Sequence, residues 1–174
     1  MNNKLNKLVL AIGVLVAAGG TMAATDGSTM EVTASVAAAC SVGNGGTMAL
    51  GTIAMISADG TRATTDTSIT ATFPAICTTG TPAPTFTYAS ANASTTSFRL
   101  KGSTTATEFI TYSLFPSTDS SGTEIASGTP VAYTGFVIDG SSKALPLSAK
   151  ILAASKTGQL VQAYTDTITI TVTF

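Results

Sequence analysis

The sequence predicts an all-β protein folded as a β-sandwich. Short runs of β-branched and aromatic residues recur along the chain, separated by turns rich in Gly, Ser, Asp and Pro. From Thr167 to Phe174, threonines alternate with Ile, Val or Phe, so that the threonines lie on one face of a strand and the apolar residues on the other. No segment after residue 23 sustains a 3.6-residue period over three helical turns. Many short strands without helices are typical of a sandwich.

The first 23 residues are expected to be a secretory signal peptide. Lys4 and Lys7 precede an uncharged apolar run, residues 8–18, and small residues follow it. We therefore expect cleavage between Ala23 and Ala24. A membrane anchor is the alternative, but the run is shorter than the roughly 20 residues that span a bilayer. No membrane span is expected in the mature chain, which is long enough for one domain with its own core.

The remaining chain predicts nine strands, each rich in residues of high β-propensity. Turn residues separate them, for example Gly43-Asn44-Gly45-Gly46 and Thr79-Gly80-Thr81-Pro82. The expected strands are Met30–Ala38, Met48–Ile56, Thr67–Cys77, Pro84–Ala89, Ser97–Lys101, Phe109–Phe115, Val131–Val137, Leu145–Leu152 and Asp166–Phe174.

The first and last of these strands show the clearest alternation. The apolar positions of the first are Met30, Val32, Ala34 and Val36, and those of the last are Ile168, Ile170, Val172 and Phe174. The last strand would be an aggregation hazard if its edge were uncovered, so we expect another strand to cover that edge. The first strand is either a segment that reaches another subunit or an ordinary first strand of the same sandwich.

Cys40 and Cys77 are the two cysteines of the chain, and both lie in the part expected to be exported. A disulfide between them is expected in an oxidising compartment. It would stabilise the fold by about 3–4 kcal/mol in the chain-entropy account. A zinc site is disfavoured because zinc requires about four ligands and the chain has two Cys and no His.

Composition argues against an enzyme and against nucleic-acid binding. The absence of His excludes Ser-His and Cys-His nucleophile pairs. The carboxylate pairs Asp119 with Glu124 and Asp59 with Asp66 lie in polar turn sequence, where solvated loops are the simpler interpretation. Charged residues make up 10% of the chain and the net charge is −1, so no basic surface for nucleic acid is expected. We expect no catalytic residues, no metal and no cofactor.

Several segments resemble the spore coat U domain family, which includes pilins of the archaic chaperone–usher pathway. These are the alternating strand that ends four residues before Cys40, the second cysteine at a strand end, and the closing Tyr164-Thr165-Asp166-Thr167 followed by an alternating strand ending in Phe174. The segments Leu50-Gly51-Thr52-Ile53 and Ile110–Phe115 add to the resemblance. The chain departs from the family pattern at Ala163, where Gly is frequent, and in lacking Trp.

The resemblance implies an incomplete immunoglobulin-like β-sandwich that is completed by donor-strand exchange. It divides the chain into a signal peptide (1–23), a donor-strand extension (24–38) and a pilin domain (39–174). Met30, Val32, Ala34 and Val36 would then be donor side chains that enter a neighbour's groove. One wall of that acceptor groove, which a chaperone strand also covers, would be formed by Ile168, Ile170, Val172 and Phe174.

The partners implied are identical or related pilin subunits in a head-to-tail polymer, a periplasmic chaperone and an outer-membrane usher. The protein would pass through the periplasm to a fimbria on the cell surface and support adhesion and biofilm formation. Two alternatives stay open: a secreted, non-polymerising surface protein of the spore-coat kind, and an adhesive binding module.

Overall fold

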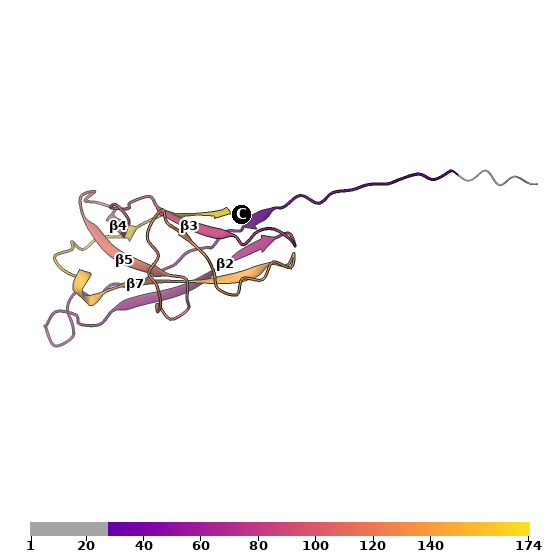
Figure 1. The fold of residues 1–174 in the computed structure, drawn as a ribbon. Coiled ribbons are helices and arrows are strands. Elements are labelled where there is room, and N and C mark those ends of the chain that lie inside the picture. The colour runs from indigo at the N-terminus through magenta and orange to yellow at the C-terminus, as the bar shows by residue number, and fades with distance from the viewer. Residues whose placement is uncertain (1–27) are drawn as a thin grey trace, which may run out of the picture. The chain divides into compact units, whose positions relative to one another are not determined.

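The computed structural model describes residues 28–174, which divide into one unit ending at Ser35 and a second, Val36–Phe174. In the first unit, residues 28–35 are exposed and none of them belongs to a strand. The second unit is all-β apart from one short 3-10 turn, η1 (Ala153–Ser155), as Figure 1 shows. The expected signal peptide and its cleavage site, Ala23 and Ala24, lie outside the described residues.

The domain consists of two antiparallel sheets. The larger has the strand order β1-β2-β7-β5-β4-β8 and the smaller the order β6-β3-β9, and every described strand pair is antiparallel. The strands are β1 (Cys40–Val42), β2 (Thr67–Cys77), β3 (Thr85–Ser90), β4 (Phe98–Gly102), β5 (Phe109–Phe115), β6 (Pro130–Val131), β7 (Lys143–Ile151), β8 (Tyr164–Thr165) and β9 (Ile168–Thr173).

Side chains from both sheets meet in one hydrophobic core. The strands supply it at alternate positions, as a pleated strand with one buried face must. The buried members are Phe73, Ala75, Phe86, Tyr88, Phe98, Ile110, Tyr112, Leu114, Ile125, Leu145, Leu147, Ala149 and Ile151. This arrangement confirms the predicted all-β, immunoglobulin-like sandwich.

An aromatic cluster closes one part of this core. The rings of Phe86 and Tyr133 pack edge to face with centroids 5.4 Å apart, and Phe73 packs against Phe86 in the same way at 5.9 Å. The Tyr133 hydroxyl donates to the Pro146 carbonyl at 2.9 Å, so its oxygen accepts from the Tyr88 hydroxyl at 2.7 Å. Burial raises the pKa of Tyr133 to about 12 and raises that of Tyr88 further.

Most of the predicted strands are confirmed. Thr67–Cys77 and Phe109–Phe115 have the expected bounds, and the strands expected near residues 84–89, 97–101, 145–152 and 166–174 are present with ends that shift by one or two residues. The sequence did not predict β8, because two residues are too few to show a period. The sequence also did not predict β1, because this short strand forms only by pairing with the end of β2, where Cys40 lies opposite Cys77.

Three expected strands are wrong in whole or in large part. Of Val131–Val137 only Val131 is in a strand, because the positive φ of Gly135 turns the chain. Residues 48–55 form no strand, and Ile56 makes only an isolated bridge to Arg62. Met30–Ala38 forms no strand either, so it is not an ordinary first strand of the described sandwich.

Candidate functional site

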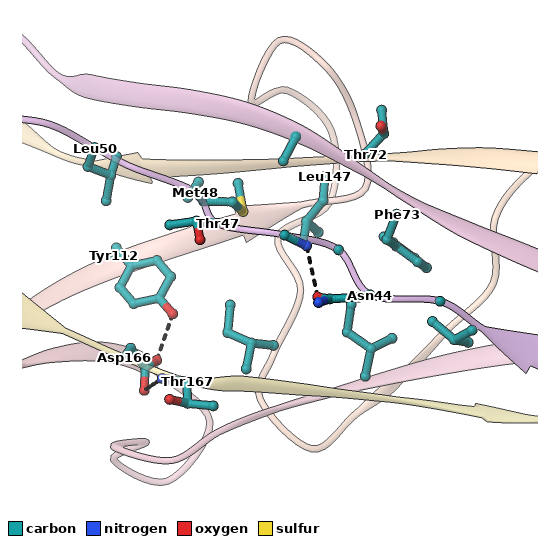
Figure 2. Close-up of a pocket in the computed structure, with 18 of the residues that line it drawn as sticks. Asn44, Thr47, Met48, Leu50, Thr72, Phe73, Tyr112, Leu147, Asp166 and Thr167 are labelled. Atoms are coloured by element: carbon teal, nitrogen blue, oxygen red, sulfur yellow. Dashed lines mark hydrogen bonds between the residues drawn. The ribbon is translucent and has the colours of Figure 1, made fainter.

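A groove of about 570 Å³ opens between β9 and the chain that follows β1. Figure 2 shows this chain on one side, with Met48 and Leu50, and β9 on the other side after Asp166 and Thr167. The floor comes from core strands, including Phe73 and Leu147. The other lining residues are Val42, Gly43, Asn44, Gly45, Gly46, Thr47, Ala71, Thr72, Leu100, Tyr112, Ala149, Ile168 and Ile170.

Both walls of the groove carry unpaired backbone. Strand β9 is the edge of its sheet and pairs with β3 alone. On the opposite wall, residues 47–54 make no backbone hydrogen bond to any residue between 28 and 174. Unpaired N–H and C=O groups along an extended edge are a template for another strand. A strand in the groove could therefore pair on both sides.

The walls also present half-buried aliphatic side chains at alternate positions. In β9, Ile168, Ile170 and Val172 are half-buried against the core, while the intervening threonines are exposed. In the facing segment, Met48 and Leu50 are half-buried in the same way. Ile168 and Ile170 line the groove, Val172 packs on the core, and Phe174 lies beyond β9 and is 47% exposed.

A polar anchor fixes the start of β9 at one end of the groove. The carboxylate of Asp166 accepts hydrogen bonds from Tyr112 Oη and Ser90 Oγ, each at 2.7 Å, and from Asn92 Nδ2 at 3.0 Å. The backbone N–H of Thr167 donates to the same carboxylate at 2.8 Å. Burial, together with the neighbouring Asp166 carboxylate, raises the pKa of Tyr112 well above its ordinary value. The anchor therefore joins β5, the β3 end and β9.

The predicted disulfide is confirmed. Cys40 and Cys77 are bonded, and they join β1 to the end of β2. Just before β1, the Ala39 N–H donates to Thr78 Oγ1 and the Thr78 N–H donates to the Ala39 carbonyl, each at 2.9 Å. The Thr78 hydroxyl also lies 3.4 Å from the carbonyl of Ala37. Residues 37–40 are thus held to the domain.

The expected donor residues are all exposed. Met30 is 87% exposed, Val32 86% and Val36 87%, and Ala34 is exposed as well. Three large apolar side chains with so little cover are unusual at alternate positions of one segment.

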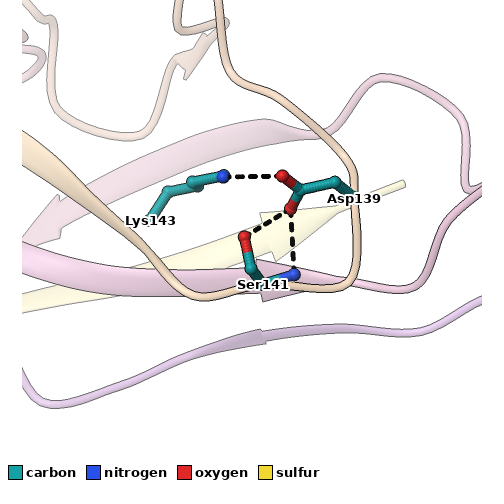
Figure 3. A network of polar contacts seen from close by, with 3 residues as sticks. All are labelled: Asp139, Ser141 and Lys143. Atoms are coloured by element: carbon teal, nitrogen blue, oxygen red, sulfur yellow. Dashed lines mark hydrogen bonds and ion pairs between the residues drawn. The ribbon is translucent and has the colours of Figure 1, made fainter.

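One carboxylate of each pair considered as catalytic, Asp59 and Asp119, caps a turn instead. Asp59 accepts from Thr61 and Asp119 from Ser121, and these hydrogen bonds lower the pKa of each carboxyl group. Asp139 also caps a turn: its carboxylate accepts from the Ser141 N–H at 2.9 Å and forms an ion pair with Lys143 Nζ at 2.8 Å (Figure 3). The hydrogen bond from Lys143, and after it those from Ser141, hold the pKa of Asp139 well below its ordinary value.

Within residues 28–174, no three Cys, Asp or Glu side chains come together as a metal site would require. Over the same range, no helix is long and apolar enough to cross a membrane.

The fold and the groove define an immunoglobulin-like sandwich with one side open beside its last strand. The family model of the Spore Coat Protein U domain matches residues 26–171, and the chain belongs to this family. The family is associated with subunits of chaperone–usher pili and is a structural surface-domain family. No curated protein matches the chain.

Proposed function

We propose that this protein is a structural subunit of an extracellular fimbria, assembled by the chaperone–usher pathway through donor-strand complementation. The observation that supports this most directly is the groove with unpaired backbone on both walls, present in a chain that also carries an exposed alternating segment. A periplasmic chaperone would first cover the groove with a strand of its own. An outer-membrane usher would then exchange that strand for the N-terminal segment of the next subunit.

The donor segment suits the groove in its two-residue period. Its apolar side chains stand two residues apart, as do the half-buried side chains of β9. Burial of three or four of them would contribute about 4–8 kcal/mol, at roughly 1.5–3 kcal/mol for a large apolar side chain, with Ala34 contributing less. Backbone pairing along both walls would fix the register, because a slip by one residue turns the apolar side chains outward.

The direction of insertion decides where the donating subunit lies. Because every described strand pair is antiparallel, we infer that the donor runs antiparallel to β9. Val36 would then lie beside Ile168, and the body of the donating subunit would lie at the end where β9 begins. Such a contact joins two different surfaces, so each subunit can accept one neighbour and donate to another. The result is an open fibre rather than a closed dimer.

Two variants of the donor segment test this proposal. Val32→Asp places a charge on the apolar face, whereas Thr33→Asp places the same charge on the alternate face. Surface material is sheared from cells and run on a denaturing gel with and without boiling, because strand-exchanged polymers dissociate slowly. We expect a boiling-sensitive ladder for wild type and Thr33→Asp, and none for Val32→Asp or for a deletion of residues 28–37.

The alternatives give other results on the same gel. A wild-type protein that is exported but runs as a monomer in every lane would favour a non-polymerising coat protein or a monomeric binding module. A Val32→Asp variant with a wild-type ladder would exclude the assigned donor face. The proposed role in adhesion and biofilm formation is tested by comparing surface attachment of cells that make wild type, Thr33→Asp or Val32→Asp.

A further inference from the structure

Residues Ala37–Ala39 form a joint between the donor segment and the domain, and this joint is short and held by hydrogen bonds. Three residues, Ala37–Ala39, separate Val36 from Cys40, so Val36 and Cys40 are at most about 14 Å apart at roughly 3.3–3.6 Å per residue. Thr78 holds this stretch through the hydrogen bonds to Ala37 and Ala39, and the disulfide fixes Cys40 immediately after it. The joint therefore has little freedom to act as a flexible linker.

The domain has two poles. The disulfide pole carries Cys40, Cys77 and the C-terminus, which lies beside β1 in Figure 1. The opposite pole is where β2 and β9 begin and β7 ends, since Thr67 pairs with Ile151. This inference rests on the proposed function: with Val36 of a second copy beside Ile168, the short joint brings that copy's disulfide pole against the opposite pole of the first.

The opposite pole exposes large apolar side chains that the fold does not use. Ile56 is 67% exposed, Leu152 42%, Leu160 52%, and Val161 is fully exposed. The loops that carry them are tied together: Arg62, which bridges Ile56, donates from Nη2 to the carbonyls of Ala153 and Ala154 at 3.0 and 2.9 Å.

Hydrogen bonds between nearby residues close the loop between β7 and β8, residues 152–163. Gln159 Nε2 donates to the Ser155 carbonyl at 3.1 Å, and the Tyr164 hydroxyl donates to the Leu160 carbonyl at 3.0 Å. The loop is also held from beneath, where the buried ammonium of Lys156 donates to the Thr65 carbonyl and to Thr67 Oγ1, each at 2.7 Å. The exposed apolar side chains therefore stand on anchored loops.

We propose that the loops of the opposite pole, with Ile56, Leu152, Leu160 and Val161, are a docking surface for the disulfide pole of a second copy of this chain. Because the joint spans at most about 14 Å, it keeps the disulfide pole of the donating copy close to the opposite pole of the accepting copy after strand exchange. The apolar side chains are then covered at each junction, which limits bending between successive subunits. The contact adds to the donor strand and is separate from the groove.

Engineered cysteine pairs test this contact, because both natural cysteines are already bonded to each other. Val161→Cys is combined in turn with Thr79→Cys, Ala83→Cys or Ser141→Cys, which are exposed positions near the disulfide pole. The matched control combines Val161→Cys with Thr171→Cys, an exposed position within β9. Sheared fibres are run without reductant, unboiled and boiled, and then with reductant.

At least one of the three pairs should give a ladder that survives boiling and collapses on reduction, while the ladder of the Thr171 control is lost on boiling. The contact is overturned if all three pairs lose their ladders on boiling as the control does, although their unboiled ladders match wild type. Absence of an unboiled ladder from wild type itself would overturn the proposed function and, with it, this contact.

Discussion

The hydroxyl of Tyr112 donates a hydrogen bond to the carboxylate of Asp166, with 2.7 Å between Oη and Oδ2. Tyr112 is a core residue of β5, whereas Asp166 stands just before β9. The contact therefore connects the interior of the larger sheet to the start of the strand that forms one wall of the groove. It explains why a carboxylate precedes an otherwise alternating Thr and Ile strand.

Replacement of Tyr112 by Phe should destabilise the domain by about 1–3 kcal/mol, because a hydrogen bond to a charged group is lost in a partly buried setting. The matched control is Tyr164→Phe, which removes a hydroxyl that donates to the Leu160 carbonyl and accepts from Gln162 Nε2, and which should cost less because neither partner is charged. Urea unfolding of the purified domain measures both. Equal losses for the two variants would contradict the anchoring role.

The stability of the domain should fall at alkaline pH. Tyr88, Tyr112 and Tyr133 have folded-state pKa values above the ordinary value of about 10, and that of Tyr133 is about 12. The unfolded chain therefore releases these protons first, so their contribution is fully present below about pH 10 and is lost as pH rises beyond it.

Unfolding free energies measured from pH 9 to pH 12 check this expectation. Tyr133→Phe is the informative variant: its stability at pH 9 should be lower, because two hydrogen bonds are removed, but its decline with pH should be shallower. A decline as steep as that of wild type would show that Tyr133 does not contribute.

Loss of the disulfide should lower the unfolding free energy by about 3–4 kcal/mol, since the bond closes a loop between residues 37 positions apart. The double variant Cys40→Ser with Cys77→Ser isolates this effect without leaving a free thiol. Thermal or urea unfolding gives the difference, and reduced wild type serves as the control. A double variant as stable as oxidised wild type would contradict the expectation.

A charge in the acceptor groove should prevent assembly while leaving the domain folded. Ile170 lines the groove and is half-buried, whereas its neighbour Thr171 faces the other way and is exposed. Ile170→Asp should therefore give no boiling-sensitive ladder, and Thr171→Asp should keep one. Circular dichroism verifies that both variants are folded. Ladders of equal yield from the two variants would be incompatible with the groove as the acceptor site.

The two strands whose bounds were predicted correctly at both ends share a physical property. Thr67–Cys77 and Phe109–Phe115 lie inside the larger sheet, where a neighbour on each side supplies the pairing that an alternating sequence requires. The failures lie where that pairing is missing. Residues 48–55 have the composition of a strand, but no strand of the described domain pairs with them.

The candidate site was predicted in part for the same reason. Alternation placed Ile168, Ile170 and Val172 on one face, and the structure has all three half-buried. Phe174 fits the same pattern but lies past the end of β9. The facing wall, Met48 and Leu50, was expected as an ordinary strand, and no local signal marks it as one side of a groove.

The sequence by itself determined the all-β class, the disulfide and the alternation of apolar and polar residues in the first and last segments, because these depend on local period and on cysteine count. The tertiary structure decided that β9 is an edge, that residues 47–54 lie across from it without pairing, and that Asp166 is tied to Tyr112. These features depend on contacts between residues far apart in the chain. Which strand borders which, and which edge stays empty, follows from the packing of the whole core.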